Sequence, residues 1–419
     1  MRRSKRYIAV TMAIVCVIAL VAVACGAPPP ATDATAKTIK IGHFTNLTGG
    51  GATWGSGIFP GIDSYFKYVN NELGGIEYKD PVTGETNHVL LEVNQYEEGD
   101  DVAVGISGYK RAKSWGAKLI TLQGASVAEG MVGLASKDEI PVYNLGGMTP
   151  TMVAADPRYN MGFYNSMAEQ VAATLGWIKD GWTESRAPRV GIAECDIPSH
   201  RPVGDPRTFA YAESLGVEMF VEWIPIVATD NKVEITRLVQ NEVDWIITGV
   251  GNPIILMKDG VRTGATKDIK WLLQQYNFDE RWFKHFPDGE MEGFYLQSLT
   301  ALPSETDVPG IQLASEVRSK YDNQSLTLYY LQGFVFAMTA CDNIKAALEE
   351  VGYDNLSSSA INYALQHMTN IDTMGLTPPI TVDPDYPITI TACKYGIVEP
   401  GYTLKILSDF VSVPPIMKP

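Results

Sequence analysis

Histidine and serine side chains are the first candidates for chemistry in this sequence, and their spacing does not predict an active site. None of the five histidines forms the HxxxH or HExxH pattern that sets two imidazoles on one helical face for zinc; they are His43, His88, His200, His285 and His367. Ser199 and His200 lie close to Asp196, but the serine lacks a GxSxG elbow, and neighbours in sequence do not make a triad. We therefore expect neither catalysis nor a metal site.

Phosphate-binding features are also weak. Gly249-Val250-Gly251 follows an apolar run, yet the third glycine of a dinucleotide fingerprint is missing and no P-loop occurs. The net charge is −15, and removal of the four basic residues near the N-terminus would leave −19. Such an acidic surface repels phosphate backbones. We expect no cofactor and no nucleic-acid partner.

The N-terminus, MRRSKRYIAVTMAIVCVIALVAVACGAPPP, carries a targeting signal. Four basic residues precede an apolar segment, 8–23, that is too short and too close to the terminus for a convincing membrane span. Ala22-Val23-Ala24-Cys25 resembles the lipobox of bacterial lipoproteins, whose thiol takes a lipid before cleavage, although Leu is usual where this chain has Ala22. An ordinary secretory signal or an uncleaved anchor is the alternative. We predict a signal peptide at 1–25 with a lipid on Cys25, a flexible stalk at 26–37, and a location outside the cytoplasm.

Length and cysteine usage limit the architecture. The 419 residues are too many for one compact core, so two lobes of ordinary domain size are expected. Beyond the leader only Cys195, Cys341 and Cys393 remain, and none has CxxC spacing. Whether any two of them pair stays open, but a disulfide scaffold is not expected.

Short apolar runs alternate with helical patterns from Thr38 onward. In the first part, strands are predicted at 38–44, 88–95, 118–123 and 141–146, with helices at 53–73, 101–115 and 126–137. The same alternation of strands and helices then begins again. Strands are predicted at 163–167, 189–195, 219–225, 244–250, 269–275 and 293–299, and helices near 169–180, 205–215, 232–241, 253–262 and 279–286. This alternation is typical of an α/β fold with doubly wound parallel sheets.

The remaining segment predicts helices at 310–321, 326–351 and 357–367, followed by a hairpin of 388–396 and 402–410 around Glu399-Pro400-Gly401. Two successive α/β units suggest two lobes with a cleft between them. Ligands of such sheets bind beyond the carboxyl ends of the strands, so the loops there are the predicted site.

Four stretches resemble the branched-chain amino acid and amide class of type I periplasmic solute-binding proteins. They are IKIGHFTNLTGGGATWGSGIFPGIDSYFKYVNNELGGI, GASVAEGMVGLASKDEIPVYNLGGMTP, ESLGVEMFVEWIPIVATDNKVEITRLVQNEVDWIITG and YYLQGFVFAMTACDNIKAALEEVG. No single motif is decisive, but their order and spacing match the family over about residues 38–410. The resemblance implies two Rossmann-like lobes joined by three crossings. It assigns 38–157 and 299–372 to the first lobe, and 158–298 and 373–419 to the second.

The resemblance also implies a binding site. Ser126 matches a hydroxyl that hydrogen-bonds a ligand carboxylate, although it could equally be a helix N-cap, and Gly146 and Gly147 match the backbone of the same pocket. Met148 falls where amino-acid binders usually have Thr, and Gln275 falls where they have a Glu that pairs with the ligand's ammonium. Since Gln cannot neutralise a buried cation, these departures argue against the usual α-amino acid pose.

Three further residues complete the predicted site. Trp54 corresponds to an aromatic over the apolar part of the ligand, with packing at the lobe edge as its alternative. His200 corresponds to a polar contact from the second lobe or to an exposed loop histidine. Asn252 would contact ligand or cap the helix that begins at Pro253.

The resemblance implies a monomeric protein that captures a small polar or amphipathic solute, of amino-acid, amide or carboxylic-acid type. It would deliver this solute to the transmembrane subunits of an ABC import permease. The alternative is a ligand-sensing ectodomain that reports to a separate signalling partner; a neighbouring permease gene or kinase gene would distinguish the two.

Overall fold

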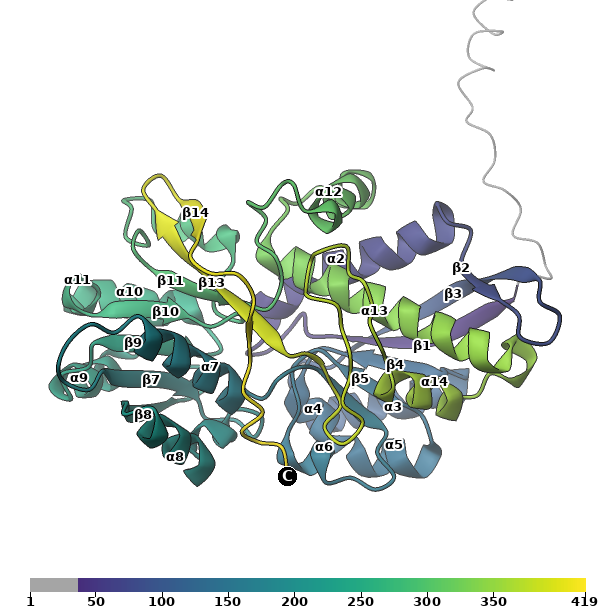
Figure 1. Ribbon diagram of the computed structural model, residues 1–419, viewed down its shortest axis with the longest axis horizontal. Helices are drawn as coiled ribbons and strands as arrows, with labels where there is room; N and C mark the ends of the chain where they lie inside the picture. Colours follow the sequence, from purple (N-terminus) through teal and green to yellow (C-terminus); the bar gives the residue numbers. More distant parts are fainter. Residues whose placement is uncertain (1–36) are drawn as a thin grey trace, which may run out of the picture. The chain divides into compact units, whose positions relative to one another are not determined.

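Two β-sheets organise the chain in the computed structural model, which describes residues 37–419 (Figure 1). The predicted signal peptide, Cys25 and nearly all of the predicted stalk lie outside the described residues. Within the described part, no helix has the length and apolar character needed to cross a membrane.

The first sheet has the strand order β12-β6-β5-β4-β1-β3-β2. Its strands are β1 (Thr38–Thr45), β2 (Ile76–Lys79), β3 (Thr86–Glu97), β4 (Leu119–Leu122), β5 (Val142–Asn144), β6 (Asn160–Tyr164) and β12 (Ile388–Ile390). All neighbours pair in parallel except β2, which forms an antiparallel pair with β3. We call this sheet and the helices packed on it the first lobe.

Helices cover both faces of the first sheet, as its buried strands require. They are α2 (Ala52–Asn71), α3 (Val102–Trp115), α4 (Ala125–Gly130), α5 (Val132–Asp138), α6 (Pro150–Val153), α12 (Pro309–Tyr321), α13 (Leu328–Val351) and α14 (Ser358–Gln366), with a 3₁₀ turn at Tyr353–Asn355. Leu119 on β4 packs in the cluster that contains α2 and α13, whereas the next residue, Ile120, packs in the cluster that contains α3, α4 and α5. Alternate side chains of a strand therefore enter two separate cores.

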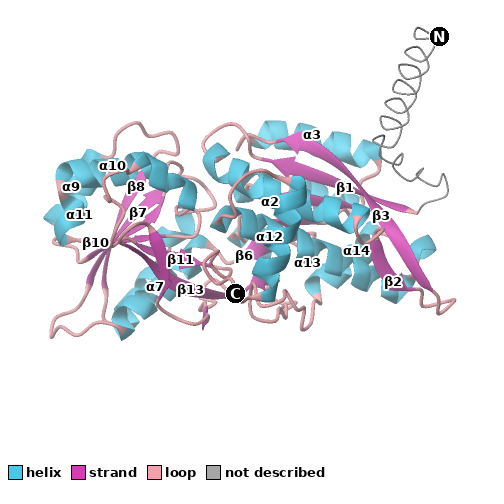
Figure 2. Ribbon diagram, turned by 90° about the horizontal axis from the view of Figure 1, so that it is seen from above, coloured by secondary structure: helices cyan, strands magenta, loops and turns pink. Residues whose placement is uncertain are grey.

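The second sheet has the order β14-β13-β11-β10-β9-β7-β8, and β15 also pairs with β13. Its strands are β7 (Arg189–Cys195), β8 (Glu218–Ile224), β9 (Trp245–Gly249), β10 (Lys270–Leu273), β11 (Tyr295–Ser298), β13 (Ala392–Glu399), β14 (Thr403–Ile406) and β15 (Val411–Ser412). The helices are α7 (Met167–Asp180), α8 (Pro206–Ser214), α9 (Lys232–Gln240), α10 (Pro253–Thr263) and α11 (Ala265–Asp268), with 3₁₀ turns at Arg201–Gly204 and Glu280–His285. Figure 2 shows the strands of this second lobe between its helices.

The doubly wound α/β fold predicted from the sequence is confirmed, with two corrections to the lobe boundaries. Strand β6 pairs with β5 in the first sheet, so the first crossing follows Tyr164 and not residue 157. The predicted strand 388–396 is two strands, because β12 pairs with β6 whereas β13 pairs with β11 of the other sheet. The third crossing therefore follows Ile390 and not residue 372. Thr391–Cys393 lie between the last residue that pairs with β6 and the first that pairs with β11.

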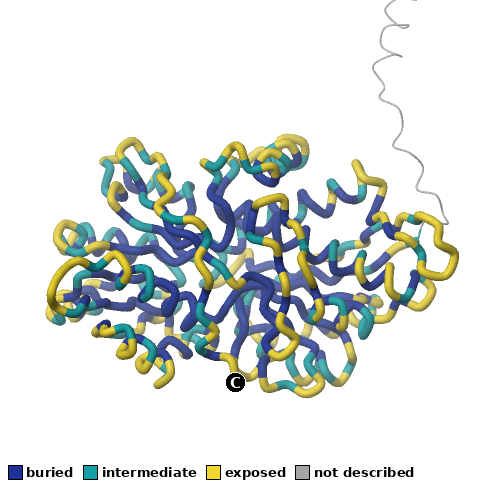
Figure 3. Tube along the Cα trace, viewed as in Figure 1, coloured by how far each residue is buried: buried dark blue, intermediate teal, exposed yellow. Residues whose placement is uncertain are grey.

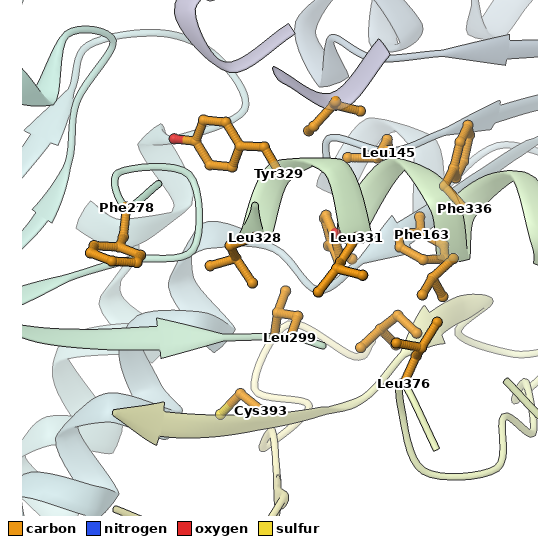
Figure 4. Packing of buried hydrophobic residues seen from close by; sticks show 14 of the residues in the cluster. Leu145, Phe163, Phe278, Leu299, Leu328, Tyr329, Leu331, Phe336, Leu376 and Cys393 are labelled. Atoms are coloured by element: carbon orange, nitrogen blue, oxygen red, sulfur yellow. The ribbon is translucent and has the colours of Figure 1, made fainter. Parts of the chain in front are cut away.

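Helix α13 is buried along most of its length and packs against α2 (Figures 3 and 4). Figure 4 shows Leu331 and Phe336 of α13 beside Leu145 and Phe163. Two glycines permit the close approach of the two helices. A Cβ on Gly61 of α2 would overlap the Tyr330 carbonyl of α13, and a Cβ on Gly333 would overlap the Ile58 carbonyl of α2.

Candidate functional site

A cavity of about 850 Å³ lies between the two lobes, where loops leave the carboxyl ends of parallel strands. From the first lobe it is lined by Asn46, Gly49–Gly51, Trp54, Gly99–Val102, Gln123–Ser126, Glu129 and Gly146, and from the second by Cys195, Ile197–His200, Ile226, Val227, Val250, Gly251 and Tyr276. These residues follow β1, β3, β4 and β5 on one side and β7, β8, β9 and β10 on the other. Both sheets therefore present the edge at which open α/β sheets bind ligands.

The lobes touch each other directly at the cavity wall. Ser126 Oγ lies 3.2 Å from Ser199 Oγ, and the rings of Trp54 and Tyr276 meet edge to face at 5.2 Å between centroids. Beside them, Arg281 Nη2 donates to the carbonyl oxygen of Thr53 at 3.2 Å. A solute inside the cavity would thus be contacted from both lobes.

Two carboxylates hold the loops of the first lobe in place. Asp100 accepts from the Gly51 N–H at 2.6 Å and from Asn46 Nδ2 at 2.5 Å. Glu98 is fully buried and accepts from the Gly124 N–H at 2.7 Å. Burial raises the pKa of both carboxyl groups, and for Glu98 the nearby charge of Asp100 raises the pKa further.

On the second lobe, the buried Glu194 holds His200. Their Oε1 and Nδ1 atoms lie 2.5 Å apart, and Glu194 Oε1 also accepts from the Cys195 N–H at 3.0 Å. Burial raises the pKa of Glu194, while the nearby His200 lowers it by a smaller amount. Burial also raises the pKa of the Cys195 thiol to about 12, so this wall cysteine is an un-ionised thiol near neutral pH.

Metal-binding side chains do not cluster in the part of the chain that the structure describes. Across residues 37–419, no cluster of three or more His, Cys, Asp or Glu side chains is arranged to hold a metal ion. His43 lies in the core with Nδ1 2.8 Å from Thr121 Oγ1, and burial lowers its pKa to about 3. His43 therefore belongs to the core of the first lobe and not to the cavity wall.

A sequence profile described as periplasmic binding protein matches residues 38–392. The chain belongs to the periplasmic binding protein family. Members are solute-binding components of ABC transporters that act outside the cytoplasm, bind small molecules and catalyse no reaction. The match covers the whole first sheet and every strand that bounds the cavity, and it ends at the start of β13.

Solved structures share the fold of this binding protein. A substrate-binding protein from Aeropyrum pernix superposes with a TM-score of 0.77 at 20% identity, over 90% of this chain and 97% of that one. A branched-chain amino acid ABC transporter protein from Thermus thermophilus with bound valine gives 0.77 at 18% identity, over 91% and 98% of the two chains. A solute-binding protein from R. palustris in complex with 4-hydroxybenzoate gives 0.72 at 17% identity, over 90% and 98%. No curated protein sequence matches the chain.

Four of the eight ligand-binding residues predicted for this binding protein line the cavity: Trp54, Ser126, Gly146 and His200. The other four lie elsewhere. Met148 is buried in the first-lobe core, where a Cβ on Gly162 would lie 2.6 Å from its Cγ. Gly147 makes a turn with φ of +92°, and Asn252 caps α10 by accepting from the Ile255 N–H at 3.4 Å.

Gln275 is fully buried beside the cavity, and its neighbour Tyr276 lines the wall instead. Sequence reasoning also missed Asp100, Gln123 and Glu194. Asp100 follows a predicted strand and could have been found by position, because the predicted site was the set of strand-end loops. Glu194 lies inside the strand sequence RVGIAEC, so only its buried contact with His200 reveals it.

Proposed function

We propose that this protein captures a small polar or amphipathic solute between its two lobes and delivers it to an ABC import permease. The observation that carries the proposal is the cavity itself, which strand-end loops of both lobes line. A solute that contacts both walls stabilises the closed arrangement relative to an open one, because only the closed form makes both sets of contacts.

We further propose that a lipid on Cys25 holds the protein at the outer face of the membrane, with 26–37 as the stalk. Labelling with an alkyne fatty acid in a bacterial host tests this part. The wild type and a Cys16→Ser control should both carry the label, and Cys25→Ser should not. Label retained by Cys25→Ser would contradict the lipid anchor.

Transport is tested with the full-length protein and the permease encoded beside its gene, reconstituted together in liposomes. We first find a solute that raises the melting temperature; a concentration one hundred times Kd should add about 2.7 kcal/mol to the free energy of unfolding. The solute-loaded protein should then stimulate ATP hydrolysis and solute uptake. Tight binding without stimulation would favour the second candidate, a ligand-sensing ectodomain with a separate signalling partner.

A further inference from the structure

The charged side chains of the cavity wall are acidic. Asp100, Asp101 and Glu129 line the cavity, and none of its described lining residues is Lys or Arg. His200 is the one basic side chain among the described residues that line the cavity, and it contacts the carboxylate of Glu194.

Buried polar groups at the wall have unused hydrogen-bonding capacity. Within the described chain, Glu98 Oε2 and Glu194 Oε2 have no hydrogen-bond partner, although both residues are fully buried. The Gln123 side chain lines the cavity, is fully buried and leaves Nε2 unpartnered among the described residues. Unpaired buried polar atoms are costly. Of these three residues only Gln123 lines the cavity, so a solute oxygen that accepts from its Nε2 would relieve part of that cost.

Neighbouring arginines do not balance these carboxylates, because each has a partner of its own. Arg281 Nε donates to Asp279 Oδ1 at 2.5 Å, and Arg201 Nε donates to Asp196 Oδ1 at 3.1 Å. Burial raises the pKa values of Asp100 and Glu194, as expected for carboxyl groups that lack sufficient positive charge nearby.

Aromatic rings lie on the same wall. Trp54 and Tyr276 both line the cavity, one from each lobe, with their rings 75° apart. The face of an aromatic ring attracts a cation, most strongly for tryptophan. Carboxylates and aromatic rings together form the usual surroundings of an organic ammonium group.

Two groups of the first lobe that could bind a carboxylate already have protein partners. The Gly124 N–H, at the start of α4, donates to Glu98, and the Ser126 hydroxyl lies in hydrogen-bond contact with Ser199. A solute carboxylate would also lie near Asp100 and Glu129, which would repel it.

From these observations we infer that the solute is an organic cation without a carboxylate, carrying a protonated or quaternary amine on an apolar body. This inference rests on the proposed solute-binding function. It differs from the amino-acid and carboxylic-acid classes considered from the sequence. It also differs from valine and 4-hydroxybenzoate, which are bound in two structures of similar fold.

Matched compounds that differ only in charge test the inference on the compact unit Thr38–Pro419. One series is tyramine, 4-hydroxyphenylacetamide, 4-hydroxyphenylacetate and tyrosine; another is 3-methylbutylamine, its amide, its acid and leucine; choline is added as a quaternary amine. At equal millimolar concentration, at least one amine should raise the melting temperature more than its matched partners. If a carboxylate, an amide or an amino acid stabilises the protein instead, solute binding stands and the inference fails. If no compound acts, both fail.

Variants then locate the charge effect for the best amine. Asp100→Asn and Glu129→Gln should each weaken its affinity about tenfold in calorimetric titration, because each removes a carboxylate from the wall. Asn also tolerates the positive φ of 57° at position 100. Glu213→Gln, an exposed change on α8 with the same loss of charge, should leave affinity within about twofold. Equal weakening in all three variants, or none in the first two, would overturn the inference.

Discussion

Ser126 of the first lobe and Ser199 of the second lobe face each other across the cavity wall, with their hydroxyl oxygens 3.2 Å apart. The contact joins helix α4, which follows β4, to the loop after β7, so it exists only while the lobes are closed. Either hydroxyl can give up this contact and form a hydrogen bond with a solute instead. No charged group is exposed by that exchange.

Removal of the Ser199 hydroxyl should shift the equilibrium between open and closed forms. A neutral hydrogen bond contributes about 0.5–1.5 kcal/mol, so Ser199→Ala should open the solute-free protein by up to about tenfold in population. Single-molecule energy transfer between dyes on the two lobes would measure this change. The exposed variant Ser214→Ala on α8 is the control, and an unchanged distribution in Ser199→Ala would show that the contact does not hold the lobes together.

Loss of the Trp54 ring should weaken solute binding. Trp54 meets Tyr276 edge to face, and such aromatic pairs contribute about 0.5–1.5 kcal/mol beyond the area they bury. We expect Trp54→Ala to weaken the affinity for the solute by about tenfold or more. The affinity of Trp54→Phe should lie between those of Trp54→Ala and the wild type. Trp223→Ala, at an exposed tryptophan on β8, should leave affinity unchanged in the same titration; equal losses at both positions would contradict a specific role for Trp54.

Restoring the residue that amino-acid binders have at position 148 should not restore their specificity. Met148 lies in the core, so Met148→Thr leaves a void and buries a hydroxyl group. We expect the free energy of unfolding, measured by chemical denaturation, to fall by about 2–4 kcal/mol. Met219→Thr, at a partly buried position on strand β8 where a β-branched residue fits, should cost far less. A gain of leucine affinity in Met148→Thr would place this side chain at the solute after all.

The buried carboxyl group of Glu98 should make the stability of the protein depend on pH. The pKa of Glu98 in the folded protein lies well above its usual value of 4.5, which applies to the unfolded chain. At a pH between these two pKa values, Glu98 is protonated in the folded protein and ionised in the unfolded chain. Stability should therefore fall as pH rises from about 4.5 through the folded pKa. Glu98→Gln should flatten this fall and raise the melting temperature at neutral pH, because the amide oxygen still accepts from Gly124. The exposed variant Glu92→Gln should retain the wild-type profile.

The helix crossing predicts opposite effects for two alanine substitutions. Gly333→Ala would push a Cβ into the Ile58 carbonyl, which should cost about 1–3 kcal/mol of unfolding free energy. Gly176→Ala on α7 meets nothing closer than the Tyr211 hydroxyl at 3.9 Å and should gain about 0.5–1 kcal/mol. Similar changes in both variants would show that the close approach of α2 and α13 is not what requires Gly333.

Local sequence pattern was sufficient for most of the strands and helices. RVGIAEC was predicted at 189–195 and forms β7 over those same residues, because a short, largely apolar segment bounded by turn residues is typical of a strand buried in a parallel sheet. The segment 388–396 has an equally clear strand pattern. Its division at Thr391 was not predictable, since an extended backbone looks the same whichever sheet it joins.

The site was predictable by position more than by identity. Trp54, Ser126 and His200 were found through the resemblance to the family, and all three line the cavity near the ends of strands. Met148 was misplaced because resemblance gives the position of a residue but not the direction of its side chain, which here follows the turn at Gly147. The contact of Glu194 with His200 depends on the fold of the loop between them, which no periodic pattern encodes.

The single residue between β12 and β13 has a mechanical consequence. Thr391 can change its two backbone dihedrals, but one residue cannot lengthen the path between the strands on either side of it. Sliding of one sheet past the other is therefore restricted at this connection, whereas rotation about it is not. A rotation of one lobe about this short connection would open the mouth of the cavity.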